Sequence, residues 1–438
     1  MDTQQKQSTN WVAVITMMFI YGMISFVTNL AAPMGNVWKY QPGIEGSNML
    51  GMMGNMMNFL AYLFMGIPAG KMLTKCGYKK TAMIGIATGF VGVAIQFLSG
   101  KVPGTAESMV GPFCVYLLGA FVCGFSVCML NMVVNPMLNL LGGGGNRGNQ
   151  LNLIGTTFNS VAGTATPMLV GALIGQVTAA TKVADVNLVM YIAMAVFAAA
   201  FVALAFIPIA NPEQGNTTEN IPVLAPLKFR HCLLGVVGIF MYVGIEIGIP
   251  ATMNLWLADA KGPLAGVANS AGIAGMVAGT YWFLMLIGRS VGAFIGGKVS
   301  SRVLMTVTTG TAIVLIAVGT QLTGVATKMP VFTGSGFEMV QVPLTALLFA
   351  LCGLCTSIMW PSTFNLATEK LGKYTAAASG LFMVMVVGGG ILPLVQNFIA
   401  DKAGYMVSYI IPAAALAYLF VYSAFLSKPP KNIDELVK

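Results

Sequence analysis

Long apolar stretches with almost no charged residues dominate this 438-residue sequence. Only 8% of the residues are charged, whereas soluble domains carry about 25%. A chain this poor in charge cannot cover a water-facing surface, so lipid must be its solvent. No part of the chain is long and polar enough to form a sizeable soluble domain. The sequence therefore predicts an all-α protein whose helices lie within a bilayer.

Twelve stretches reach the length that a membrane-spanning helix requires, which is about 20 mostly apolar residues. They cover approximately residues 11–33, 48–70, 80–99, 112–141, 150–176, 187–208, 231–257, 270–297, 302–324, 342–368, 375–400 and 404–426. The polar N-terminus contains no signal-peptide pattern. The longest polar insert separates the sixth span from the seventh. We therefore predict an N-terminal six-helix bundle at 1–208, a cytoplasmic linker at 209–230 and a C-terminal six-helix bundle at 231–438.

The positions of the basic residues predict the orientation of the chain. With the N-terminus in the cytoplasm, fifteen Lys and Arg residues fall on cytoplasmic segments and six on external ones, and Arg289 lies inside the eighth span. This bias follows the positive-inside rule, so we expect a multi-pass protein of a bacterial inner membrane with both termini in the cytoplasm. It also explains the net charge of +9 without a nucleic-acid partner, because basic loops face anionic lipid.

Three pairs of landmarks recur in the two halves at nearly constant spacing. The members of each pair lie 225 to 227 residues apart: Gly70 and Gly297, Pro136 and Pro361, and Pro167 and Pro393. Three agreeing offsets, each six helices long, indicate two parallel six-helix repeats. Parallel halves with a site at their midplane interface are the arrangement of the major facilitator fold.

Polar side chains inside the predicted spans mark the interior, because unpaired polar groups are costly in hydrocarbon. Asn131, Asn135 and Asn139 recur every four residues, so they share one face of the fourth span. Asn152 and Asn159 share a face of the fifth span. Amides donate and accept hydrogen bonds, which suits a neutral polyhydroxyl ligand better than a charged one. The alternative is that they cross-link helices; for the stripe on the fourth span we favour a cavity.

Glu246 is the only acid that we place deep in the membrane. A carboxylate there costs about 2.5 kcal/mol or more on insertion scales. Burial favours its neutral form, so it could bind and release a proton, or it could hydrogen-bond a sugar. The alternative is a structural partner for another polar side chain. Arg289 lies nearer the cytoplasmic end of its span, where a structural or gating role is expected.

Trp360 precedes Pro361 within the tenth span, where proline frees backbone groups and the indole could stack on a sugar ring. Trp256 and Trp282 are expected instead as interfacial anchors. A single histidine, His231, and scattered cysteines cannot build a metal site or a catalytic constellation. We therefore predict no metal, no cofactor and no enzymatic activity.

Six motifs run through most of the chain. They are PAGKMLTKCGYKK after the second span, NP and FNS in the fourth and fifth, FMYVGIEIGIP in the seventh, IGRSVGAFIGGKVSSRVL in the eighth, SIMWPSTFNLATEKLG in the tenth and VGGGILPLVQNFIAD in the eleventh. Together they resemble the fucose–proton symporter family of the major facilitator superfamily, including its glucose/galactose permease branch. The glutamate of the seventh span is similar to that of the glucose/galactose branch.

The departures from this family concern proton coupling. Two acids that the resemblance ties to coupling in the fucose branch are Asn29 and Asn131 here. An amide cannot cycle a proton, which leaves proton coupling through Glu246, sodium coupling or uncoupled facilitation. The resemblance also implies that Asn159 faces substrate, that Trp360 replaces a substrate-facing tyrosine, and that a glutamine of the family becomes threonine at position 156.

The sequence thus predicts a secondary transporter that imports a neutral sugar, a hexose or deoxyhexose, by alternating access and with proton coupling. The alternatives are an uncoupled or sodium-coupled sugar facilitator, and an exporter of amphipathic drugs or lipids, which would lack aligned amides. The expected partners are the sugar, a proton or sodium ion and the bilayer, and the protein is expected to be a monomer.

The predicted site residues form two sets. The predicted substrate contacts, with Glu246 also as the coupling site, are Asn131, Asn135, Asn159, Trp360, Glu246, Asn29, Thr156, Asn365, Gln396 and Asn397. The predicted conformational latch is made of Gly70, Lys71, Lys75, Gly77, Lys79, Lys80 and Arg289.

Overall fold

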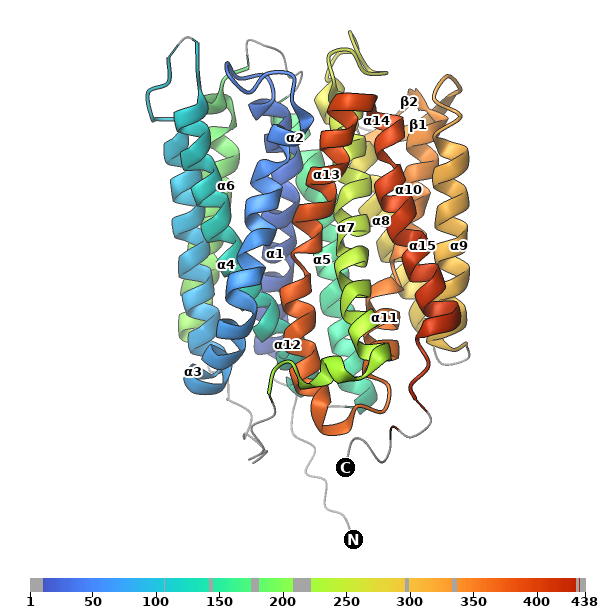
Figure 1. Ribbon diagram of the computed structural model, residues 1–438. Helices are drawn as coiled ribbons and strands as arrows, with labels where there is room; N and C mark the ends of the chain where they lie inside the picture. The colour runs from blue at the N-terminus through green and yellow to red at the C-terminus, as the bar shows by residue number, and fades with distance from the viewer. Residues whose placement is uncertain are drawn as a thin grey trace.

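The computed structural model describes residues 11–430 except 106, 142–144, 175–180, 208–221, 296–298 and 333–336, together with residue 433. The described chain forms long helices that run side by side in one bundle (Figure 1). Among the described residues, eleven segments are long and apolar enough to cross a membrane. The long helix α5 (Gly145–Ile174) runs beside them, so the architecture agrees with the twelve predicted spans of a multi-pass membrane protein.

We call the segments from α1 to α6 the N-terminal half. Its helices are α1 (Trp11–Trp38), α2 (Asn48–Gly51), α3 (Met53–Ser99), α4 (Val110–Leu141), α5, the 3-10 turn η1 (Val183–Val186) and α6 (Asn187–Phe206). Helix α3 contains two predicted spans, because the chain reverses at Gly77. The φ angle of Gly77 is 79°, a left-handed backbone conformation that glycine adopts without steric cost.

The segments from α7 onward form the C-terminal half. They are α7 (Arg230–Ala258), α8 (Ser270–Ile295), α9 (Ser301–Gly319), α10 (Leu344–Thr356), α11 (Met359–Thr368), α12 (Thr375–Met385), α13 (Gly388–Ala403), α14 (Tyr405–Ser408), α15 (Ile410–Val421) and the π-helical η4 (Tyr422–Leu426). Two 3-10 turns, η2 (Ala225–Lys228) and η3 (Gly372–Tyr374), precede α7 and α12.

The structure differs from the predicted spans of this half in three details: the end of the ninth span and a break inside each of the tenth and eleventh spans. The span predicted at 302–324 ends at Gly319. An antiparallel hairpin of β1 (Ala326–Phe332) and β2 (Phe337–Pro343) follows, so the tenth span begins only at Leu344. That span is interrupted between α10 and α11, and the span predicted at 375–400 is interrupted between α12 and α13, directly before three glycines. Glycine weakens a helix interior, which explains the second break.

Contacts within and between the halves place the core. In the N-terminal half α3 packs against α4 and α6, and α1 packs against α5. In the C-terminal half α7 packs against α8, α11, α13 and α15. The halves meet where α5 packs against α8 and where α3 packs against α12 and α13. Most of the linker predicted at 209–230 lies outside the described residues, so the division at that linker stays a prediction.

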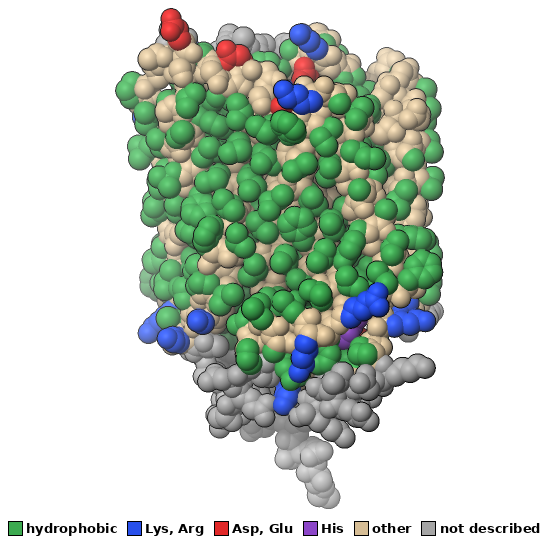
Figure 2. All heavy atoms as spheres, viewed as in Figure 1, with side chains coloured by type: hydrophobic (Ala, Val, Ile, Leu, Met, Phe, Trp, Pro, Cys, Tyr) green, Lys and Arg blue, Asp and Glu red, His purple; other side chains and the backbone are tan. Residues whose placement is uncertain are grey.

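The surface of the bundle is an apolar belt with charges at its two ends (Figure 2). Lys and Arg gather at the lower end in this view, where α7 begins, and Asp and Glu appear at the upper end, where α1 and α7 end. We call these ends the lower face and the upper face. Large apolar side chains such as Phe206 and Phe294 are more than four-fifths exposed, as a lipid-facing belt requires.

Candidate functional site

A narrow cavity, called the central cavity below, lies between the two halves in the upper part of the bundle. Its lining comes from α1, α3, α5, α7 and α8: Thr28, Asn29, Ala32, Pro33, Asn55, Pro167, Ile247, Pro250, Ala251, Asn254, Ala278 and Trp282. Three of these residues are prolines on three different helices, and each leaves a carbonyl of its helix without the usual partner. The space suffices for about one or two water molecules, so a larger ligand requires the halves to separate.

Amides of this central cavity link the two halves. Asn55 Nδ2 donates to the carbonyl oxygen of Gly389 at 2.8 Å, and Asn36 Nδ2 donates to Oδ1 of Asn254. These amides therefore cross-link helices in this conformation. Asn29, a predicted substrate residue, lines the same cavity.

The tryptophan of the central cavity is Trp282, not Trp360. Trp282 is only 4% exposed, and its ring lies edge-to-face with Tyr281 at 5.7 Å. Its expected role as an interfacial anchor is therefore wrong, and Trp256 is buried as well. Trp360 does not line this cavity; its ring packs against Tyr242, with 5.9 Å between the centroids.

Glu246 of α7 and Arg289 of α8 pair with each other inside the bundle. Arg289 Nη2 lies 3.4 Å from Glu246 Oε1, and the two side chains are 16% and 15% exposed. Arg289 Nη1 donates to the carbonyl of Thr156 at 3.1 Å and to Ser160 Oγ at 2.8 Å. An ion pair withdrawn from water needs such additional bonds to offset its lost hydration. Because Thr156 and Ser160 lie on α5, the guanidinium bridges the two halves.

This charged cluster, defined as Thr156, Ser160, Tyr242, Glu246 and Arg289, lies just below the central cavity. On α7, Glu246 precedes the cavity residue Pro250 by about one helical turn, and Tyr242 precedes Glu246 by another. Three predicted residues, Thr156, Glu246 and (through its ring contact with Tyr242) Trp360, are thus brought together. The pairing of Glu246 with Arg289 was not predicted, although two opposite charges inside one bundle must find partners.

Two further predicted amides lie within the N-terminal half. Asn131 Nδ2 donates to Tyr62 Oη at 2.7 Å, and Asn159 Nδ2 donates to the carbonyl of Tyr21 at 3.3 Å. Both amides are half-buried and connect neighbouring helices. Asn135 belongs to α4, but its side chain lies outside the described part of the structure.

The three amides predicted on the C-terminal helices lie apart from the cavity lining. Asn365 is exposed on α11. Gln396 and Asn397 are buried on α13, and Asn397 Nδ2 donates to Thr252 Oγ1 at 3.0 Å and to the carbonyl of Pro393 at 2.8 Å. The role of Asn397 in this conformation is to join α13 to α7.

The predicted latch residues of α3 lie where this helix reverses at the lower face, whereas Arg289, the remaining predicted latch residue, belongs to the charged cluster. Lys79 Nζ donates to the carbonyls of Ala205 and Ile207 at 2.9 and 2.8 Å, at the end of α6. A lysine there satisfies carbonyls that the last turn of a helix leaves free. The other latch residues of this segment are Gly70, Lys71, Lys75, Gly77 and Lys80. The hydrogen bonds of Lys79 to α6 stay within one half, so its role as a latch between states remains a prediction.

Metal-binding chemistry is not indicated in the described part of the chain. No group of three or more His, Cys, Asp or Glu residues there could hold a metal ion. His231 is buried, and its Nε2 lies 3.1 Å from the carbonyl of Glu369, which makes it part of a helix contact.

The proteins that are similar in sequence to this chain are named as sugar transporters. No family model matches the chain. A protein named glucose/galactose transporter from Brucella abortus is 27% identical over 377 residues, which cover 84% of each chain. The L-fucose-proton symporter of Escherichia coli is 24% identical over 408 residues, covering 85% of this chain and 84% of the symporter. These homologues bear out the resemblance found in the motifs.

A solved structure identifies the fold. The major facilitator superfamily transporter FucP, in an outward conformation, superposes with a TM-score of 0.65 at 18% identity, over 95% of this chain and 98% of FucP. The chain therefore has the major facilitator fold, as predicted.

Proposed function

We propose that this protein is a secondary transporter that imports a neutral sugar by alternating access and couples the import to a proton. The observation that carries the proposal is a cavity lined by amides and a tryptophan, between the halves of a chain whose homologues are named sugar transporters. The names of these homologues, a transporter and a symporter, support transport as the activity of this protein.

The chemistry of the central cavity supports a neutral sugar. Asn29, Asn55 and Asn254 supply amide donors and acceptors, which match hydroxyl groups that also donate and accept. Trp282 supplies an aromatic face for the apolar side of a sugar ring. The lining contains no charged side chain, so a charged ligand would lack a counter-ion there. A deoxyhexose and a hexose both satisfy these requirements.

The charged cluster supports coupling through Glu246. Its carboxylate lies near the middle of α7, and it is held by Arg289, which also bonds α5 of the opposite half. When Glu246 binds a proton, it loses the charge that attracts the guanidinium, and the bridge between α7, α8 and α5 is weakened. A proton can thereby change the contact between the halves. Sodium coupling and uncoupled facilitation are the alternatives.

The charge distribution supports the topology. Lysines and arginines gather at the lower face, so we place this face in the cytoplasm of a bacterial inner membrane, with both termini on that side. The upper face is then external, and the basic turn of α3 with Lys79 lies at the cytoplasmic surface, where we propose that it helps to latch the halves.

Sugar binding gives the first prediction. The purified protein is expected to bind glucose, galactose or fucose, and Trp282→Leu is expected to weaken binding about tenfold, because one lost ring contact is worth roughly 1.4 kcal/mol. Isothermal titration calorimetry measures both. The matched control is Trp11→Leu, the same change at the exposed start of α1. Unchanged affinity in Trp282→Leu would exclude this tryptophan from the site, and absence of binding by any neutral sugar would contradict the proposed substrate.

A further inference from the structure

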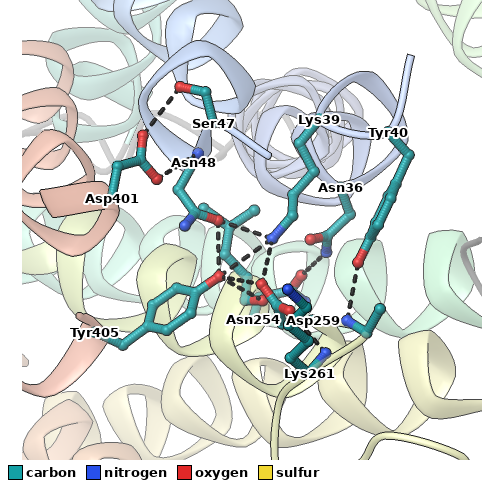
Figure 3. Close-up of polar contacts among 12 residues, drawn as sticks. Asn36, Lys39, Tyr40, Ser47, Asn48, Asn254, Asp259, Lys261, Asp401 and Tyr405 are labelled. Carbon is teal, nitrogen blue, oxygen red and sulfur yellow. Dashed lines mark hydrogen bonds and ion pairs between the residues drawn. The ribbon is translucent and has the colours of Figure 1, made fainter. Parts of the chain in front are cut away.

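A buried ammonium group lies at the upper face, directly on the seam between the halves (Figure 3). Lys39 follows the end of α1 and is only 3% exposed. Its Nζ contacts three oxygens: Asp259 Oδ2 at 2.8 Å, Asn48 Oδ1 at 2.8 Å and Tyr405 Oη at 3.1 Å. Lys39 and Asn48 belong to the N-terminal half, whereas Asp259 and Tyr405 belong to the C-terminal half. The lysine therefore occupies an oxygen cage built from both halves.

The cage replaces the water that a lysine loses on burial. An ammonium group is strongly hydrated, and withdrawing it from water costs several kcal/mol unless charged and polar partners offset the loss. Asp259 provides the counter-charge, and it is held in place because Oδ2 accepts from Tyr405 Oη at 2.7 Å and Oδ1 accepts from the backbone N–H of Lys261 at 2.9 Å. Removal of Asp259 would leave the buried ammonium without a counter-charge, and removal of Lys39 would leave the half-buried carboxylate without its ion-pair partner.

Two further contacts join the halves around this ion pair. The carboxylate of Asp401 accepts from Ser47 Oγ at 2.9 Å and from the backbone N–H of Asn48 at 2.7 Å, so α13 is tied to α2. Tyr40 Oη accepts from the backbone N–H of Ala260 at 2.9 Å. The Lys39–Asp259 pair is thus the charged centre of a wider polar seam that covers the upper face.

The seam lies directly above the central cavity. Asn36 precedes Lys39 by about one helical turn, and it donates to Asn254, which lines the cavity. Asn254 in turn precedes Asp259 on the same segment. A path from the upper face to the cavity must therefore pass between the residues of the seam.

We propose that Lys39 is a tethered cation that locks the upper face, and that the protein opens its cavity to that side only when the Lys39–Asp259 pair breaks. The inference rests on the proposed function, because alternating access requires such an opening. The ammonium carries its own charge into the cage, so closure needs no external cation. This role differs from that of the charged cluster, which contacts the opposite half through α5 lower in the bundle.

The lock is expected to weaken at both ends of the pH range, because each partner must stay charged. Burial opposes ionisation of Asp259, but Lys39 and the hydrogen bonds to this carboxylate outweigh it, so the pKa of Asp259 lies below its ordinary value. The ionised carboxylate of Asp259 therefore stabilises the closed state fully at any pH above its ordinary pKa. This stabilisation is lost as the pH falls through the lowered pKa. Tyr40, Tyr405 and Lys261 also face this carboxylate. Burial lowers the pKa of Lys39, and Asp259 and Asp401 oppose this shift only in part, so the pair is also lost as the pH rises through that lowered pKa.

Labelling of a cavity cysteine from outside tests the lock. Ala251 lines the cavity and is buried, so A251C is expected to react slowly with a membrane-impermeant methanethiosulfonate in intact cells. Adding Lys39→Met is expected to raise the labelling rate by on the order of tenfold or more, because the half-buried carboxylate of Asp259, left without a counter-charge, then favours exposure to water. Mass spectrometry of the peptide that carries position 251 gives the rate. T105C, on an exposed upper loop, shows that the reagent reaches this face.

Control variants separate the lock from general damage. Asp259→Asn is expected to raise labelling like Lys39→Met, and the double variant should exceed neither, because both remove one interaction. The charge swap of Lys39→Asp with Asp259→Lys should bring labelling back toward the original rate, and Lys261→Gln, a neighbouring lysine that meets Asp259 only through its backbone, should leave it unchanged. Unchanged labelling of A251C in both single variants, with T105C labelled, would overturn the lock. The labelling rate is measured without sugar, so a failure of the lock can be distinguished from a failure of the proposed substrate.

Discussion

Proteoliposomes that contain Glu246→Gln are expected to take up sugar only to equilibrium, whereas the unmodified protein accumulates it. A glutamine cannot bind and release a proton, so an inward proton gradient no longer drives the sugar. One charge moving through 100 mV supplies about 2.3 kcal/mol, which corresponds to roughly 50-fold accumulation that the variant should lose. Accumulation of labelled glucose, galactose or fucose under an imposed gradient measures the effect.

Counterflow is the exchange of labelled for unlabelled sugar without net proton movement. It shows whether Glu246→Gln still folds and transports sugar after coupling is lost. Counterflow should persist in Glu246→Gln, because the amide oxygen can still accept a hydrogen bond from Arg289. The matched control is Glu338→Gln, the same change on an exposed residue of β2, which should accumulate sugar normally. If Glu246→Gln accumulated sugar as the unmodified protein does, Glu246 would not be the coupling site.

The second large effect is expected at the contact between α5 and α8. Gly275 of α8 lies so close to α5 that an added Cβ would collide with the carbonyl oxygen of Pro167. A backbone atom cannot move aside as the end of a flexible side chain can. Gly275→Ala should therefore force α5 and α8, and with them the two halves, apart. Such overpacking costs about 1–3 kcal/mol, equivalent to a shift of roughly 5- to 150-fold away from the closed upper face. The counterflow rate should fall, and labelling of A251C from outside should rise.

A glycine without neighbours provides the control for this steric argument. Gly380 lies in α12 of the same half, and a Cβ added there meets nothing within 4 Å. Gly380→Ala should therefore leave counterflow and labelling unchanged, or stabilise α12 slightly, since alanine favours helix more than glycine does. Equal behaviour of the two variants would contradict a tight α5–α8 contact.

The spanning helices could be predicted because lipid imposes a simple rule on the sequence. A run of about 20 apolar residues has little alternative to a spanning helix. The hairpin at 326–343 was not predicted, because its strands carry apolar residues such as Met329, Val340 and Val342 next to the tenth span. Hydropathy does not record the breaks within the tenth and eleventh spans, because the residues on both sides of each break are mostly apolar.

The site was only partly predictable, because pairing between distant segments leaves no local pattern. Glu246 and Arg289 were each identified as charges inside the membrane, but their contact joins residues 43 positions apart. Lys39 and Asp259 are 220 positions apart and looked like ordinary loop charges until the fold brought the ends of α1 and α7 together. Trp282 was misplaced for the same reason, because composition cannot tell an interfacial tryptophan from one that faces a cavity.

Uptake of labelled hexoses and deoxyhexoses by proteoliposomes tests the central claim most directly. The purified protein would be compared under an inward proton gradient, an inward sodium gradient and no gradient, with protein-free liposomes as the baseline. We predict that at least one neutral sugar enters faster than the baseline and accumulates only under the proton gradient. Accumulation under sodium alone would assign a different coupling ion. Uptake of no neutral sugar under any of the three conditions would contradict the proposed function.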